Sequence, residues 1–442
     1  METKTEQPAV DVSTAPNGQI AARPRGLNRL TGRIWLPPGA ILRPKGGALS
    51  VPEFRWFWYG SIVSNVGSWM QMVAMGWLIL ELTNSPFYLG LIGLVRAVPA
   101  LSITLIGGVV ADRVDRRGLL IVTQSAAGVL AVILGVLDFS GVITIGQLLA
   151  IAFVSSVVMA FDNPARQALV PDLVGTENVA SAIGLNSAAW NSAAIIGPSI
   201  AGVLVAAIST AGAFFLNGVS YFAVVYALWK IRPRPPRPRG PQSMFQNLRA
   251  GLSFIRQDRR IWGLIVILTV PTFFGRPYTQ MMPIFAQNVL HVGAGGYGVL
   301  MAATGVGALA GALMVGKLGA SSKKGYYLLI LTAIFGVSLF GFALSRWFIP
   351  SLLVLVVTGG AATLFMSLTN TLLQLNVPEE MRGRVMSVYT LVPMGMMPLG
   401  SMAIGTVGDV AGVPLTVAVG AVLILCFTLV AFRLFPAVRR MP

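Results

Sequence analysis

Twelve long apolar stretches determine what this chain can fold into. A helix needs roughly 20 apolar residues to cross the hydrocarbon core of a bilayer, and each stretch is about that long. The stretches are continuous rather than alternating, so they predict helices and not the strands of a membrane barrel. They lie at Trp56–Leu80, Phe87–Val110, Leu119–Leu137, Ile143–Phe161, Ile183–Ile208, Ala211–Trp229, Ile261–Ile284, Tyr297–Val315, Tyr326–Leu344, Ile349–Leu375, Val385–Val407 and Val413–Phe435.

The composition excludes a water-soluble domain. Of the 442 residues, 55% are hydrophobic and 11% are charged, less than half the charged share of an ordinary soluble protein. The single cysteine, Cys426, rules out an intrachain disulfide, and the single histidine, His291, argues against a hydrolytic triad or a His/Cys metal site. We therefore expect no cofactor, no metal and no enzymatic activity.

The basic residues predict which side of the membrane each loop occupies. Twenty-nine of the 32 Lys and Arg residues fall in the two termini and in alternate loops, which by the positive-inside rule are cytoplasmic. This places both termini in the cytoplasm of a multi-pass protein of the cell membrane. The net charge of +17 therefore reflects topology rather than nucleic-acid binding. Only Arg346 lies in an opposite loop, and Arg96 and Arg276 fall inside spans.

A long basic loop divides the spans into six and six. Near-constant offsets, such as 208 residues between Gly108 and Gly316, suggest duplicated halves. The fold class is thus an all-α membrane protein with 12 transmembrane helices in two pseudo-symmetric six-helix bundles. The expected parts are a disordered basic tail (1–50), a first bundle (51–230), a cytoplasmic linker with an amphipathic helix (231–260), a second bundle (261–436) and a short tail (437–442). For the first tail, a lipid-surface anchor is the alternative.

The loop after the second span carries a family motif. It runs Gly108-Val-Val-Ala-Asp112-Arg113-Val-Asp115-Arg116-Arg117, and this resembles motif A of the major facilitator superfamily, G-x-x-x-D-R-x-G-R-R. Asp115 departs from the usual glycine. Together with the twelve spans, the resemblance covers the chain from about Val51 onward and implies a transporter.

Two further passages narrow the resemblance. The run Asp162-Asn-Pro-Ala-Arg166, with Pro378-Glu-Glu-Met-Arg382 in the second half, looks like the enterobactin-exporter-like branch. In the fifth span, Gly197-Pro198 and Gly202 resemble the antiporter motif of drug:proton antiporters. The resemblance implies a kinked, tightly packed helix that seals the transporter against leak, although ordinary helix packing is the alternative.

The resemblance also implies a gate at the cytoplasmic helix ends. Asp112 is expected to face the positive N-terminus of the eleventh span, and Asp162 is expected to pair with Arg116. Charges that only orient the helices are the alternative, which we favour for Arg117. The predicted gate comprises Gly108, Asp112, Arg113, Arg116, Arg117, Asp162 and Arg166.

Polar side chains inside the spans predict a central substrate cavity. Charged side chains within a membrane are rare and usually face a cavity or a partner, so Arg96 and Arg276 are candidates to bind an anionic group, or else to pair with carbonyls. The predicted cavity residues are Asn65, Ser68, Gln71, Arg96, Asn186, Trp190, Asn191, Arg276, Tyr278, Gln280, Asn370 and Tyr389.

These features predict a secondary transporter that exports a small amphipathic molecule, such as a drug or a siderophore, by alternating access. Uptake of a nutrient, lysolipid flipping and a non-transporting receptor are the alternatives. Proton coupling is implied by the resemblance, but no acid lies at mid-membrane, and the candidates are Glu81, Asp138 and Asp162. The expected partners are the substrate, protons and membrane lipids, with no nucleic acid, and the expected form is a monomer.

Overall fold

The computed structural model describes residues 47–232, 244–319 and 321–441. The predicted N-terminal tail therefore lies almost wholly outside the described residues, as does the Pro- and Arg-rich start of the central loop. The described residues belong to one compact unit.

The first half consists of long helices whose ends follow from local chemistry. Asp115, the departure from the family motif, is the N-cap of α4 and accepts hydrogen bonds from the backbone N–H groups of Arg117 and Gly118. Thr144 and Gln147 form a capping box at the start of α5. The helices are α1 (Pro52–Thr83), α2 (Pro86–Ser102), α3 (Thr104–Arg113), α4 (Arg116–Phe139), α5 (Ile145–Ala207) and α6 (Thr210–Trp229).

Helix α5 is two spans joined at a kink. It is 63 residues long, and Gly175 within it has a φ of 70°, outside the helical region. Glycine adopts positive φ without steric penalty, so the fourth span can turn into the fifth without an intervening loop. The second span is also not straight: it is bent by 49° between Pro86–Ser102 and Ile106–Arg113.

In the second half, the seventh span is broken. It consists of α8 (Arg259–Phe274), a 3-10 turn (Arg276–Thr279), the short α9 (Met282–Ile284) and a π-helical turn (Phe285–Val289). Pro271, Pro277 and Pro283 lie along it, and proline lacks the N–H that continues a helix. The other elements are α7 (Met244–Gln257), α10 (Gly293–Gly319), α11 (Lys324–Leu344), α12 (Phe348–Asn376), α13 (Glu379–Ala411), α14 (Val413–Leu434) and α15 (Pro436–Arg439).

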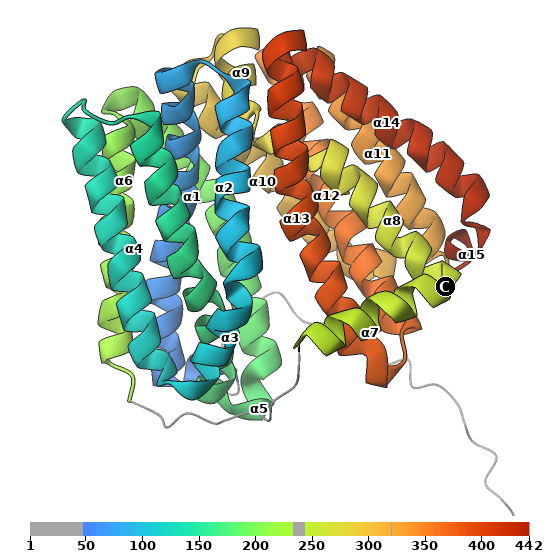
Figure 1. Cartoon of the computed structure of the whole chain (residues 1–442), viewed down its shortest axis with the longest axis horizontal. Coiled ribbons are helices and arrows are strands. Elements are labelled where there is room, and N and C mark those ends of the chain that lie inside the picture. Colours follow the sequence, from blue (N-terminus) through green and yellow to red (C-terminus); the bar gives the residue numbers. More distant parts are fainter. Residues whose placement is uncertain (1–46, 233–243, 320, 442) are drawn as a thin grey trace, which may run out of the picture. The chain divides into compact units, whose positions relative to one another are not determined.

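The predicted fold class is confirmed. Ten described helices are long and apolar enough to cross a membrane, or eleven if the bent pair α2 and α3 is one span, and the kink in α5 divides one of them into two. Figure 1 shows α1 to α6 grouped on one side and α8 to α14 on the other, with α7 crossing below.

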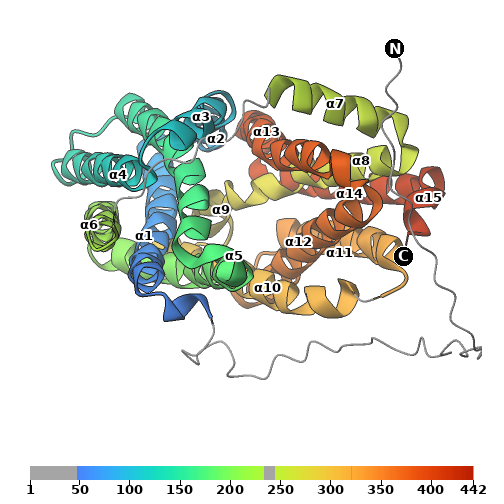
Figure 2. The same cartoon turned by 90° about the horizontal axis from the view of Figure 1, so that it is seen from below.

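Two lines of helix packing join the halves: α2 packs on α13, and α5 packs on α10. Figure 2 shows both pairs from below. The contacts gather toward one membrane face, where Ser85 donates a hydrogen bond to Asp409 at 2.8 Å and the rings of Trp77 and Tyr297 stack 6.1 Å apart. We call this the weakly charged face. The other face, where α1, α4 and α8 begin and where Arg117, Lys230 and Arg260 lie, is the basic face.

The halves diverge toward the basic face. On α5, Ala194 lies against Gly305 of α10, and Pro198 lies against Gly298. The same helical stripe continues toward the basic face through Trp190 and Ile183. These two side chains are 51% and 57% exposed. Because a side chain in this stripe would be covered if α10 still lay against it, the halves have separated by that level.

Candidate functional site

A buried arginine joins three helix ends at the basic face. Arg116, at the start of α4, is 6% exposed. Its guanidinium forms an ion pair with Asp172 of α5 and another with Asp112 of α3, the latter at 3.4 Å. It also donates to the backbone carbonyl of Ala168 at 3.3 Å. Arg116 is therefore the centre of the predicted gate in this conformation.

The predicted pairing of Asp162 with Arg116 is wrong. Asp162, 1% exposed, accepts hydrogen bonds from Thr123 at 2.8 Å and from Gln124 at 2.7 Å. The reason is helix register: α4 and α5 run antiparallel, and Asp162 and Asp172 are ten residues apart, about 15 Å along the axis. When Arg116 lies level with Asp172, Asp162 lies level with residues two turns further into α4.

Asp162 has its own ionic partner, Arg166, one turn along α5. The Arg166 Nε–Asp162 Oδ2 distance is 3.2 Å. The Arg166 guanidinium also donates to Ser61 of α1 at 3.0 Å and lies over the ring of Phe57, 5.5 Å from its centroid. This network links α1, α4 and α5 inside the first half.

The remaining motif A residues have separate places. Arg117 donates to the carbonyl of Leu228 at 2.7 Å and so satisfies the C-terminus of α6. Arg113 is exposed, and no atom lies within 4 Å of a Cβ built on Gly108. Asp112 has its ion pair with Arg116, and among the described residues neither an ion pair nor a hydrogen bond joins it to the start of α13, which it was predicted to face.

Two of the predicted cavity residues make contacts inside their own half of the protein. Tyr278 is fully buried in the second half, with its ring against Phe342. Gln71 accepts a hydrogen bond from the buried Asn217 of α6, because the face of α1 that carries Gln71 also carries Gly67, which packs on α6. The prediction for Tyr278 is therefore wrong for this conformation, whereas Gln71 is partly exposed and stays a prediction.

Other predicted cavity residues are at least partly accessible. Trp190 packs on Trp69 with ring centroids 5.5 Å apart. Tyr389 donates to the Met366 carbonyl at 3.1 Å, so it bridges α13 and α12. Hydrogen bonds within their own helices hold Asn191 and Asn370. The partly exposed remainder is Asn65, Ser68, Asn186 and Gln280.

The two arginines inside spans have no acidic partner. Within the described part of the chain there are three ion pairs, and they involve neither Arg96 nor Arg276. Arg96 is exposed and Arg276 is partly exposed. On α2, Arg96 lies about 200° around the helix from Val98, which is 52% exposed. It lies one turn from Gly93, which faces Ser401 of α13. Arg96 therefore points toward the other half rather than toward lipid.

The predicted sealing residues lie in tight helix contacts. A Cβ on Gly197 would lie 2.8 Å from the Val66 carbonyl of α1. A Cβ on Gly202 would lie 2.9 Å from the Cα of Gly298, and the carbonyl of Pro198 also faces Gly298. The fifth span thus packs closely against its own half on one side and against the second half on the other.

Two candidate proton carriers lie at helix ends on the weakly charged face. Glu81 accepts a hydrogen bond from the Trp77 indole at 2.6 Å. Asp138 accepts one from Thr210, at the start of α6. Both side chains keep some exposure, which distinguishes them from the buried Asp162.

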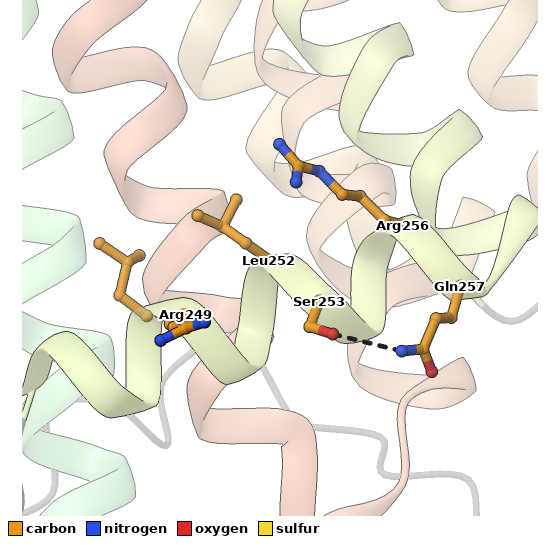
Figure 3. Close-up of a pocket in the computed structure, with 6 residues that line it drawn as sticks. Arg249, Leu252, Ser253, Arg256 and Gln257 are labelled. Carbon is orange, nitrogen blue, oxygen red and sulfur yellow. Dashed lines mark hydrogen bonds between the residues drawn. The ribbon is translucent and has the colours of Figure 1, made fainter.

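A surface hollow lies on α7, away from these networks. It is lined by Leu248, Arg249, Leu252, Ser253, Arg256 and Gln257, and Figure 3 shows Leu252 and Arg256 pointing to one side while Ser253 and Gln257 bond on the other. Gly251 and the buried Ile255 face α13 and the core. Basic and apolar side chains on one helix suit the predicted place at the membrane surface.

Comparison with known families decides the assignment. The model for transmembrane secretion effectors matches residues 47–440. The chain belongs to this family of the major facilitator superfamily. It is therefore a multi-pass membrane transporter, as the motifs predicted.

Relatives within the family move siderophores, according to their names. The chain is 26% identical to the staphyloferrin A transporter of Staphylococcus aureus over 385 residues, covering 86% of this chain and 95% of that one. It is also 26% identical to the enterobactin exporter EntS of Escherichia coli over 362 residues, with 81% and 85% covered.

Solved structures of other transporters share the fold. A bacterial homologue of the human lysosomal transporter Spinster, in an inward-facing and unoccupied conformation, superposes with a TM-score of 0.70 at 14% identity, covering 88% of this chain and 98% of that one. The nucleoside transporter NupG superposes with a TM-score of 0.69 at 11% identity, with 87% and 99% covered.

Several residues of the gate region were not among the predicted site residues. Asp172 is an ionic partner of Arg116, and Thr123 and Gln124 donate hydrogen bonds to Asp162. A sequence signal for these residues does exist, because they are polar side chains spaced by one or two helical turns inside apolar stretches. Only the register of α4 against α5 says which of them meet.

Proposed function

We propose that this transporter exports a small amphipathic molecule from the cytoplasm by alternating access, and that its basic face is cytoplasmic. The observation that carries the proposal is the asymmetry of the contacts between the halves. They meet near the weakly charged face and separate toward the basic face, where Trp190 and Arg96 are exposed. This arrangement lets a substrate enter from the cytoplasm while the far side is closed.

The substrate class follows from the accessible residues and from the relatives. Trp69, Trp190 and Met72 offer apolar surface, and Asn186 and Gln280 offer amide groups, which suits a molecule with both polar and apolar parts. The related transporters are named for staphyloferrin A and enterobactin. We therefore propose a siderophore or a similarly amphipathic compound as the cargo of a monomer.

The gate we propose is centred on Arg116. Its two acids come from α3 and α5, so a rocking motion that shifts these helix ends exchanges its partners. Motif A then acts on the cytoplasmic opening. Proton coupling remains a prediction, with Glu81, Asp138 and Asp162 as its candidate carriers.

Transport by everted membrane vesicles tests the export proposal. Everted vesicles place the cytoplasmic face outside, so an exporter accumulates substrate when a proton gradient and an inside-positive potential are imposed together. We expect accumulation of a catecholate siderophore or an amphipathic fluorescent dye. If right-side-out vesicles take up these compounds and everted ones do not, the protein is an importer. If neither preparation moves any compound of a broad panel, the transport proposal is wrong.

Cysteine labelling tests the proposed sidedness. In a Cys426→Ser background, Ser187→Cys is on the exposed stripe of α5 that faces the second half. A membrane-impermeant maleimide should label it from the cytoplasmic side. Trp347→Cys, 74% exposed at the weakly charged face, is the control and should be labelled from outside. Labelling of both from the same side would contradict the topology.

A further inference from the structure

We infer that Arg96 and Arg276 together hold the anionic part of the substrate, and that the membrane potential acting on that anionic charge drives export. The inference rests on the proposed export function and specifies its substrate charge and its energy source. Three observations support it: the position of the two arginines, the lack of an acidic partner for either of them among the described residues, and the sign of the membrane potential.

The two arginines flank one segment of α13. On one side, a Cβ on Gly93 of α2 would lie 3.6 Å from Ser401 Cβ, and Arg96 is one turn from Gly93. On the neighbouring face, Gly400 packs against Phe273 and against Pro277, the residue that follows Arg276. Each half therefore contributes one arginine, and the two lie beside neighbouring faces of α13, because consecutive residues are about 100° apart around a helix.

Both arginines lie within the membrane rather than at its surface. Arg96 is ten residues from the start of α2 at the weakly charged face, about 15 Å along the axis. Arg276 is 17 residues from Arg259, the first residue of α8 at the basic face, about 25 Å along the axis. The α13 residues beside them place the two side chains within roughly 10 Å of the same depth.

Nothing in the described helices neutralises this charge. The three ion pairs lie in the first half near the basic face. The acid of α13 nearest to this segment is Asp409, which is two turns beyond Ser401 and accepts a hydrogen bond from Ser85. Unpaired arginines inside a membrane usually face a cavity or a substrate path. An anionic substrate would supply the missing negative charge, and carboxylates or catecholates suit the planar, two-pronged guanidinium.

The membrane potential then favours export without a proton carrier. The cytoplasm is electrically negative, so the free energy of an anion falls when it leaves. For each elementary charge, a potential of about 100 mV is worth a concentration ratio of about 50-fold. Export driven in this way needs no acid that carries a proton. The arginines themselves do not cross the membrane when the halves rock, so the charge that crosses is the substrate's.

Purified protein in liposomes tests the inference. The vesicles contain carboxyfluorescein, a multiply anionic dye, or ethidium, a cation. One arm imposes an inside-negative potential with valinomycin and a potassium gradient at equal pH. The other arm imposes a pH gradient with the potential held at zero. We expect the potential, and not the pH gradient, to accelerate release of carboxyfluorescein above the rate of protein-free vesicles.

Variants link the effect to the two side chains. Arg96→Gln and Arg276→Gln should each reduce potential-driven release to the protein-free rate, while Arg96→Lys and Arg276→Lys should restore part of it because they keep the charge. Arg346→Gln removes an exposed arginine in the loop after α11 and should leave release unchanged. Elution as a single species in size-exclusion chromatography confirms that a variant is folded.

Three results would overturn the inference. If a pH gradient alone drives release at zero potential, or if only ethidium is moved, the proposed export function is retained. The inference that the potential drives export by acting on an anionic substrate is then wrong. If the glutamine variants release carboxyfluorescein as fast as the unaltered protein, the arginines are not the site. If neither dye is moved under either gradient, and everted vesicles also move no compound, both the inference and the proposed export are wrong.

Discussion

Gly202 of α5 and Gly298 of α10 meet across the two halves with no side chain between them. A Cβ on Gly298 would lie 2.5 Å from the Pro198 carbonyl and 2.6 Å from the Cα of Gly202. Both neighbours are backbone, so neither can move aside as a flexible side chain would. The contact therefore closes the weakly charged face only while both positions are glycine.

Gly298→Ala is expected to disfavour the described conformation. An extra methyl in a tight packing contact costs about 1–3 kcal/mol, which shifts the population toward the state open at the weakly charged face. The measurement is the rate at which a maleimide labels Ser187→Cys from the cytoplasmic side, which should fall.

Gly295→Ala is the matched control on the same helix. Its Cβ would meet nothing closer than 3.8 Å, so labelling should stay at the unaltered rate. Equal effects of the two alanines would show that the Gly202–Gly298 contact does not close the weakly charged face.

Gly90→Ala should likewise disfavour the described conformation, here at the contact between α2 and α13. Its Cβ would lie 2.4 Å from the Ser401 carbonyl of α13, whereas Gly93, one turn along, has 3.6 Å of room to Ser401 Cβ. We expect Gly90→Ala to reduce the transport rate by about tenfold or more and Gly93→Ala to reduce it little. The readout is initial uptake into everted vesicles, normalised to protein content. The opposite order would mean that α2 does not pack on α13 as described.

Asp112→Asn should impair turnover while leaving insertion and stability intact. The side chain of Asp112 is 33% exposed and shares Arg116 with Asp172, and a partly exposed ion pair contributes at most about 1 kcal/mol to stability. Its effect should therefore appear in transport and not in the melting temperature. Arg113→Gln, which alters an exposed neighbour, is the comparison. Unchanged transport in Asp112→Asn would argue against the gate.

Asp162→Asn should destabilise the first half. Asp162 is 1% exposed, and removing one partner of a buried ion pair costs about 3–5 kcal/mol. Arg166 keeps contacts with Ser61 and Phe57, so the lower end of that range is expected. Thr123→Val removes one hydrogen bond to the same carboxylate, worth about 1 kcal/mol. Thermal unfolding in detergent should rank the two variants in that order, and a reversed order would contradict the network.

The three candidate proton carriers can be tested one at a time, because Glu81→Gln, Asp138→Asn and Asp162→Asn each remove one titratable group. If export is proton-coupled, a pH gradient at zero potential should drive transport, and the variant that lacks the carrier should lose it. If the potential acts on an anionic substrate, none of the three should alter potential-driven release beyond its effect on folding. Loss of that release in Glu81→Gln, at the weakly charged face, would instead support an acidic carrier there.

Much of the fold and part of the candidate site could be predicted because the relevant signals are local. Apolar length, proline positions and motif A all lie within short stretches, and they predicted the twelve spans and the transporter family. The same signals placed Arg96 and Arg276 inside spans. They could not say that Gln71 turns to Asn217 of α6, or that Tyr278 is buried against Phe342, since the direction of a side chain depends on which helix packs beside it.

The sequence by itself determined which segments enter the membrane and which charges stay near its faces, because hydrophobic length and charge are properties of each segment alone. Tertiary structure decided which charges pair. Sliding α4 by one turn against α5 moves every partner by about 5.4 Å, and only the packed helices establish that Arg116 meets Asp172 while Asp162 meets Thr123 and Gln124. The glycine contacts between the halves, and the face toward which they open, are likewise decided only when both halves are assembled.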